Sequence, residues 1–156
     1  MRNYWRISSY PDLSGEGAKR ASARWHTKGN LVVYLAESPA GAMLERLVHL
    51  LDTEGQLPLT YDLLSIGAPE GTAITTIHAP KRMAWKEDFD STRKLGDTWL
   101  TSLETPLARV PSAIVPHTWN YLLNPTHPEA KQITIQEVIR ERFDNRLFRF
   151  GPSGAS

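Results

Sequence analysis

The fold is decided by residues 31–51, which read LVVYLAESPAGAMLERLVHLL. The first five form a β-branched and aromatic run that is typical of a buried strand. Ser38-Pro39 then resembles a helix N-cap followed by proline at the first helical position. Apolar residues follow at helical spacing, at Met43, Leu44, Leu47, Val48 and Leu51. The stretch therefore predicts a buried strand that leads directly into a helix over residues 39–52.

Weaker signals predict strands on both sides of this unit. An irregular segment with flexible glycines, residues 8–22, precedes it. Further strands are expected at 59–66, 73–79, 110–115 and 133–135. Pro111 interrupts one of them, which predicts an edge or bulged strand, because proline cannot donate to the hydrogen-bond ladder.

A second helix is expected to open after Asp90 and run to Leu103, with Gly96 as a weak interior point. Strands and helices that do not alternate strictly favour an α+β fold over a doubly wound sheet. A chain of 156 residues is most simply one compact domain. We expect this domain to span residues 1–150, with residues 151–156 as a disordered tail.

Composition narrows the class of protein. A formal net charge of +1 gives no global field that would recruit nucleic acid or an anionic membrane. The absence of cysteine excludes a disulfide framework, a thiolate zinc site and a thiol nucleophile, and it suits a cytoplasmic protein. The five histidines are scattered and no apolar run is long enough to span a bilayer, so we predict no metal site and no membrane segment.

The helical periodicity shows on which side of the predicted helix Glu45 lies. At about 100° per residue it lies roughly 130° from the centre of the apolar stripe, on the same side as His49. This pattern alone is typical of a solvated helix flank with a Glu–His pair one turn apart. The helical pattern therefore does not require Glu45 to have a function.

The order of several short motifs carries more information than any one of them. Arg24-Trp25, Tyr34 and Glu45 are followed far along the chain by residues 111–116, PSAIVP, and residues 120–125, NYLLNP. This arrangement resembles the RES domain, a family named for an arginine, a glutamate and a serine, and the resemblance runs from about Arg6 to Arg146. The chain departs from the usual Gly-Gly-Arg-Trp-Asn pattern, because residues 22–26 read SARWH.

The resemblance implies a fold and a function. It implies a compact fold related to ADP-ribosyltransferases, with a central curved mixed sheet and an NAD cleft beside the strand of Tyr34 and the helix of Glu45. RES domains are toxins of bacterial toxin–antitoxin pairs that consume NAD or use it to ADP-ribosylate a target. The implied partners are an Xre-type helix-turn-helix antitoxin and a second copy of the chain. The acceptor of the ADP-ribose stays open among water, phosphate and a protein side chain.

The family's arginine, tyrosine, glutamate and serine correspond to Arg24, Tyr34, Glu45 and Ser112. Arg24 suits a phosphate, because a guanidinium group is a planar and permanently charged fork. Glu45 suits the positive charge that develops on the ribose when the nicotinamide bond breaks. Tyr34 suits stacking on nicotinamide, and Ser112 suits positioning of the ligand or support of Glu45. Asn120 completes the expected cofactor-binding set.

Blander alternatives stand beside these roles. Arg24 can be a surface arginine stacked on Trp25, and Tyr34 a core tyrosine with a satisfied hydroxyl. The competing class of function is an RNA-targeting toxin or a non-enzymatic interaction domain. Its support comes from the basic pairs Lys81-Arg82 and Arg93-Lys94, a run of arginines from Arg140, and five tryptophans. The balanced net charge disfavours it.

Overall fold

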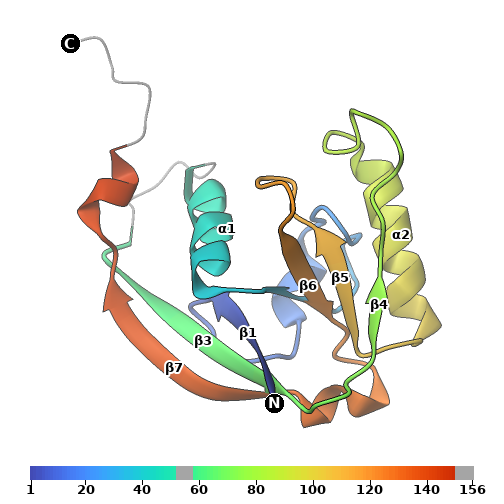
Figure 1. Ribbon diagram of the computed structural model, residues 1–156, viewed down its shortest axis with the longest axis horizontal. Helices are drawn as coiled ribbons and strands as arrows, with labels where there is room; N and C mark the ends of the chain where they lie inside the picture. Colours follow the sequence, from blue (N-terminus) through green and yellow to red (C-terminus); the bar gives the residue numbers. More distant parts are fainter. Residues whose placement is uncertain (52–57, 150–156) are drawn as a thin grey trace.

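The computed structural model describes residues 1–51 and 58–149, which form one seven-stranded sheet with two α-helices (Figure 1). Along the chain the elements are β1 (Arg2–Ile7), β2 (Val33–Ala36), α1 (Pro39–Leu51), β3 (Thr60–Ala68), β4 (Ile74–Thr76), α2 (Phe89–Ser102), β5 (Leu107–Pro111), β6 (Trp119–Leu123) and β7 (Thr134–Arg142). Short 3-10 helices lie at Glu16–Arg20, Pro128–Gln132 and Asn145–Phe148. The expected α+β class is confirmed.

The sheet is mixed and curved. Its strand order is β4-β5-β6-β2-β1-β3-β7, and the pairing of β4 with β5 is parallel, whereas the other pairs are antiparallel. β1 and β2 pair through Trp5 and Ala36. On one side of this narrow junction β3 and β7 sweep away from β5 and β6, and α1 stands in the space between the two halves (Figure 1).

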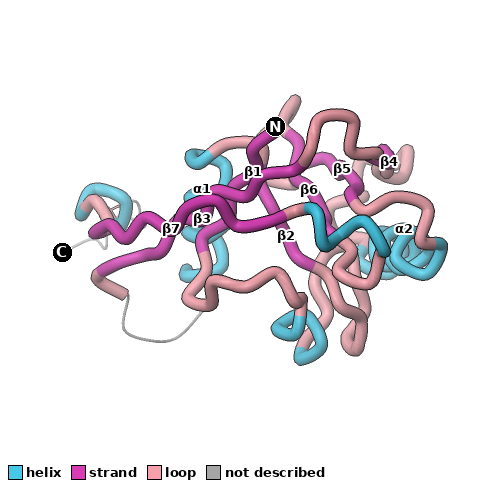
Figure 2. The backbone as a smooth tube through the Cα atoms, turned by 90° about the horizontal axis from the view of Figure 1, so that it is seen from below, coloured by secondary structure: helices cyan, strands magenta, loops and turns pink. Residues whose placement is uncertain are grey.

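The two helices cover different parts of the sheet. Seen from below, α1 lies behind β1 and β3, whereas α2 lies at the far end beside β4 and β5 (Figure 2). Trp99 and Leu100 of α2 pack against Ala108, Val110 and Leu122 of β5 and β6. A second core fills the opposite face of the sheet, with Tyr4, Leu35, Leu64, Leu107 and Tyr121 among its residues.

Strand alternation places the site. Side chains two residues apart in a strand point to the same face. Tyr34 pairs with Leu122 and Ala36 pairs with Asn120. All four therefore point to the face that carries α2, and the space between the two helices is lined by this face.

The predicted strand–helix unit is confirmed, with small shifts at its ends. The strand is β2, Val33–Ala36, and it leads into α1 at Pro39. The hydroxyl of Ser38 accepts a hydrogen bond from the amide of Gly41 at 3.0 Å, which is the expected N-cap contact. The predicted last helical residue, Asp52, lies outside the described residues, as do residues 150–156 with the predicted tail.

Several other predicted strands have different bounds. The strand expected at 110–115 is β5, Leu107–Pro111, and the interpretation of it as an edge or bulged strand is wrong, because β5 lies between β4 and β6. Pro111 is tolerated because it is the last residue of β5 and the pairing of β4 already ends at Arg109. The strand expected at 133–135 is the nine-residue β7, and the one at 73–79 is the three-residue β4.

The sequence prediction missed two strands and placed the start of one helix too late. β1 and β6 were not expected, although both lie inside the sheet. α2 begins at Phe89, not after Asp90, because Asp88 is its N-cap. Among residues 1–51 and 58–149, no helix has the length and apolarity needed to cross a bilayer. Nor does this part of the chain bring together three or more metal-binding side chains.

Candidate active site

A cavity of about 550 Å³ lies on the sheet face between α1 and the start of α2. Its walls come from β1, β2, β6, α1, the start of α2, the segment before β2 and the end of β5 with the loop after it. Four of the predicted site residues line it, namely Arg24, Tyr34, Glu45 and Asn120. A groove of about 760 Å³ runs along the outer side of α2, but none of the predicted site residues lines it. The first cavity is therefore the candidate site.

Glu45 is held in this cavity by Asn120. The side-chain amide of Asn120 donates a hydrogen bond of 2.8 Å to Oε1 of Glu45. Asn120 sits on β6 between Ala36 of β2 and Val110 of β5, so its backbone is fixed on both sides. Oε2 of Glu45 makes no hydrogen bond within the described residues and stays available to a ligand. Glu45 is thus a partly buried, oriented carboxylate and not a solvated helix flank.

Arg24 lies on the opposite side of the cavity. Its Nη1 donates a hydrogen bond to the carbonyl oxygen of Lys86, and its guanidinium carbon lies 4.8 Å from the ring centroid of Phe89 and 5.8 Å from that of Trp85. The alternative of stacking on Trp25 is not what the structure shows, because the Trp25 side chain is buried in the core. Burial lowers the pKa of Arg24, and the attraction of the Glu45 carboxylate opposes this shift. The two oppositely charged groups thus line the same cavity.

Tyr34 lines the cavity, and its hydroxyl forms hydrogen bonds with the segment that carries Arg24. The amide of Trp25 donates to the Tyr34 hydroxyl at 3.2 Å, and Nδ1 of His26 lies 2.8 Å from the same oxygen. Nε2 of His26 faces the carbonyl oxygens of Ala18 and Ala21, at 2.9 and 3.0 Å, and therefore donates to them. In the tautomer with its proton on Nε2, His26 accepts at Nδ1 from the Tyr34 hydroxyl. Burial raises the pKa of Tyr34.

Tyr34→Phe is expected to destabilise the fold by about 1–3 kcal/mol, because it leaves the buried Trp25 amide and His26 Nδ1 without their shared partner. Urea unfolding would measure this loss. Tyr10→Phe is the matched control, since the Tyr10 side chain is 72% exposed. Equal unfolding free energies for the two variants would contradict the account of Tyr34.

Helix α2 holds the backbone of the same segment from the other side. Oγ1 of Thr92 donates to the carbonyl of Arg24 at 2.6 Å, and Nε of Arg93 donates to the carbonyl of Ala23 at 2.7 Å. One turn later Gly96 lies directly against Trp25, where a Cβ atom would overlap the Trp25 carbonyl. Gly96, which has a low helix propensity, is therefore the residue at which α2 contacts the segment that carries Arg24.

Ser112 does not line the cavity. Its Oγ accepts hydrogen bonds from the amides of Ile114 and Val115, at 3.1 and 3.2 Å, and its own amide donates to the carbonyl of Thr118 at 2.9 Å. These bonds shape the loop after β5, and Ala113 and Ile114 of that loop do line the cavity. A contact of Ser112 with ligand stays a prediction.

The cavity also has walls that the sequence interpretation missed. Trp5 and Ile7 line it from β1, and Phe89 and Arg93 line it from α2. The alternation of residues 2–7, in which Tyr4 enters the opposite core, is a weak signal for the first pair. Nothing in the sequence indicated that Phe89 and Arg93 line the cavity. The local pattern predicts a helix start, but it does not show that this helix start contacts Arg24, far away in the sequence.

Comparisons with known proteins give the family. The model of the RES domain matches residues 3–146. The chain is 47% identical over 144 residues to Toxin Res of Pseudomonas putida, covering 92% of this chain and 98% of the relative. It is 37% identical over 158 positions to the Prs ADP-ribosylating toxin of Sphingobium, covering 94% and 97%.

A solved structure agrees at the level of the fold. The crystal structure of the M. tuberculosis MbcT–MbcA toxin–antitoxin complex contains a chain that superposes with a TM-score of 0.71 at 20% identity, covering 90% of this chain and 84% of that one. The match of the family model over nearly the whole chain, with two relatives above one-third identity, decides the assignment. This chain belongs to the RES domain family.

Proposed function

We propose that this chain is the toxin of a toxin–antitoxin pair and that it cleaves NAD at the nicotinamide–ribose bond. The observation that carries the proposal is the pair of opposite charges, Arg24 and Glu45, in the lining of one cavity. A volume of about 550 Å³ lies in the ordinary range of small-molecule sites. Relatives named Toxin Res and an ADP-ribosylating toxin support the same assignment.

Arg24 fits the diphosphate of NAD. A guanidinium group has five N–H donors, and the bond to Lys86 uses one of them. The other N–H groups make no hydrogen bond within the described residues. They can form the charge-assisted, bidentate contacts that favour arginine over lysine at phosphate groups.

Glu45 fits the ribose end of the substrate. When the bond between the ribose C1′ and the nicotinamide nitrogen breaks, its electron pair leaves with the ring, and the cationic nicotinamide becomes neutral. Positive charge develops on the ribose, and a carboxylate fixed nearby stabilises it. Asn120 holds Oε1, so the charge of Glu45 is already oriented before the bond breaks. Because neutral nicotinamide needs no proton to depart, one carboxylate suffices.

The remaining predicted residues take supporting roles in this proposal. The ring of Tyr34 lines the cavity and can stack on the nicotinamide, while its hydroxyl is committed to the Trp25 segment. Ser112 acts through the shape of its loop, and Asn120 through Glu45. The acceptor of the ADP-ribose is water, phosphate or a protein side chain, and the cytoplasm is the proposed place of action.

The proposed partners are an Xre-type antitoxin and a second copy of the chain. We expect a segment of the antitoxin to enter the cavity near Arg24 and Tyr34, where a carboxylate can imitate the diphosphate. The antitoxin and a non-hydrolysable NAD analogue should then exclude each other in competition binding. Simultaneous binding without loss of affinity would show that inhibition acts at a distance. Sedimentation at several concentrations tests the homodimer.

The experiment that tests the proposed activity is incubation of the purified protein with NAD and identification of the products by mass spectrometry. Release of nicotinamide is the expected result. ADP-ribose, ADP-ribose 1″-phosphate when phosphate is added, or a mass increase on an added protein would identify the acceptor. NAD that stays intact under all three conditions would refute the proposal.

The alternative of an RNA-targeting toxin gains no support from Arg140 and Arg146. Arg140 forms a two-bond contact with Asp62, at 2.7 and 2.9 Å, and Arg146 does the same with Asp144, at 3.0 and 2.8 Å. These arginines are paired with acids of the same chain, which agrees with a solvated face.

A further inference from the structure

Two arginines, and not one, share an aromatic ring at the wall of the cavity. The guanidinium carbon of Arg24 lies 4.8 Å from the ring centroid of Phe89, and that of Arg93 lies 5.2 Å from the same centroid. All three residues line the cavity. Both cations also act on the hydroxyl of Tyr34, whose pKa each of them lowers against the stronger effect of burial. The two guanidinium groups therefore lie in one small region.

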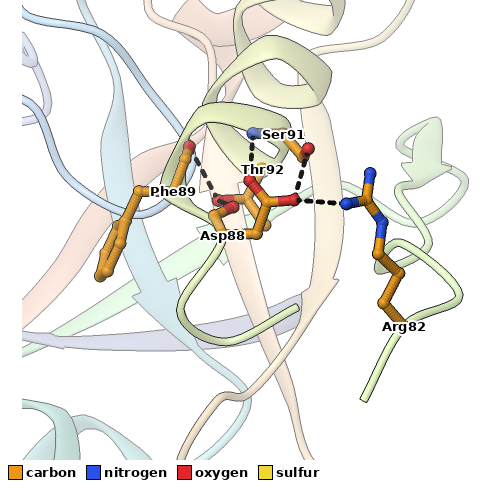
Figure 3. Close-up of polar contacts among 5 residues, drawn as sticks. All are labelled: Arg82, Asp88, Phe89, Ser91 and Thr92. Atoms are coloured by element: carbon orange, nitrogen blue, oxygen red, sulfur yellow. Dashed lines mark hydrogen bonds and ion pairs between the residues drawn. The ribbon is translucent and has the colours of Figure 1, made fainter. Parts of the chain in front are cut away.

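The backbone of Phe89 is held in place, because Phe89 is the first residue of α2 and follows the N-cap residue Asp88. The carboxylate of Asp88 caps the helix by accepting from the amide and the hydroxyl of Ser91, at 3.1 and 2.7 Å, and Arg82 lies 3.6 Å from the same carboxylate (Figure 3). Thr92, fully buried, ties this turn to the carbonyl of Arg24. The capped first turn thus holds the backbone of Phe89 next to the segment that carries Arg24, and the partly exposed ring contacts both arginines.

Arg93 has donors to spare for a ligand. It uses Nε for the carbonyl of Ala23, and its two terminal nitrogens make no hydrogen bond or ion pair within the described residues. Arg24 likewise uses Nη1 for the carbonyl of Lys86. Each arginine is therefore anchored by one backbone carbonyl and one shared ring. Two like charges held this close favour an anion between them.

We propose that Arg24 and Arg93 form a clamp for a diphosphate, and that Phe89 is the positioning residue that aligns the two guanidinium groups. The clamp rests on the proposed function, because it assigns the diphosphate of the NAD substrate to two arginines. Arg93 binds the ligand directly, whereas Phe89 acts through the two cations that stack on it.

The test is calorimetric titration of the purified protein with ADP-ribose, ADP and AMP. Arg93→Gln should weaken ADP-ribose and ADP binding by about 10- to 100-fold, the range for lost hydrogen bonds to a charged group, and should weaken AMP binding less. Lys94→Gln is the matched control, since it removes the same charge from the next residue of α2, and Lys94 does not line the cavity.

Phe89 is tested by two substitutions. Phe89→Leu should weaken ADP binding by about 3- to 10-fold, whereas Phe89→Tyr, which keeps the aromatic face, should restore it. Circular dichroism checks that each variant is folded. If Arg93→Gln does not fold, Phe89→Leu tests the clamp in its place.

The outcomes separate the clamp from the cleavage reaction. If the parent protein binds ADP through Arg93 but leaves NAD intact, the clamp is supported and the proposed activity is refuted. A parent protein that cleaves NAD while Arg93→Gln binds ADP as tightly as Lys94→Gln overturns the clamp, and so does a parent that binds no diphosphate at all.

Discussion

Glu45→Gln is expected to lower the rate of NAD cleavage by about 10²–10³, because it removes one preorganised charge that faces the developing cation on the ribose. The substitution keeps the side-chain shape, and its carbonyl oxygen can still accept the hydrogen bond from Asn120. Position and fold should therefore be retained while the charge is lost. Nicotinamide release under saturating NAD measures the effect, and calorimetry should show that NAD still binds.

Glu141→Gln is the control for this experiment, because it makes the same chemical change at an exposed position of β7. It should leave nicotinamide release unchanged. If a folded Glu45→Gln variant consumed NAD as fast as Glu141→Gln, Glu45 would have no part in the mechanism.

Gly96→Ala should destabilise the protein by about 1–3 kcal/mol or more, as overpacking of a close contact does. In an unconstrained helix the same change would stabilise by roughly 0.5–1 kcal/mol, so the sign of the effect is diagnostic. The reason is steric, because a Cβ atom at this position would overlap the carbonyl oxygen of Trp25. Urea unfolding gives the free energy of each variant.

Gly17→Ala is the matched control for Gly96→Ala. A Cβ atom at Gly17 meets no other atom within 4 Å, so this substitution should be near neutral or slightly stabilising. A Gly96→Ala variant as stable as Gly17→Ala would show that α2 does not lie against the Trp25 carbonyl. Because Arg24 directly precedes Trp25, the contact also matters for the site.

The fold could be predicted where local signals agree with tertiary structure. The run of residues 31–35 and the cap at Ser38 sufficed for β2 and α1, since burial, β-propensity and capping all favour the same elements. β1 failed because arginines at residues 2 and 6 interrupt its apolar pattern, although it lies between β2 and β3. β7 was predicted too short, at 133–135, because it is an exposed edge strand with few apolar residues.

Four residues of the candidate cavity could be predicted through the resemblance, whereas the contacts that hold them in place could not. Arg24, Tyr34, Glu45 and Asn120 were expected, and the structure brings them to one cavity. The bond from Asn120 to Glu45 spans 75 residues of sequence, so it follows from the pairing of β6 with β2 and not from any local motif.

The departure from the family's usual motif also has a structural reading. His26 stands where RES domains usually carry asparagine, and here the imidazole joins Tyr34 to the carbonyls of Ala18 and Ala21. It thereby ties the irregular segment in front of Arg24 to β2. At Gly96, helix α2 packs closely against the backbone of Trp25, the residue that follows Arg24.

The most direct test of the central claim is a crystal structure of Glu45→Gln soaked with NAD, in which the slow reaction leaves the substrate intact. The account predicts NAD in the cavity between α1 and α2, with its diphosphate within about 3 Å of the Arg24 guanidinium, which is hydrogen-bonding distance, and its nicotinamide ribose beside residue 45. NAD bound elsewhere, or bound here with the diphosphate away from Arg24 and the ribose away from residue 45, would contradict the claim.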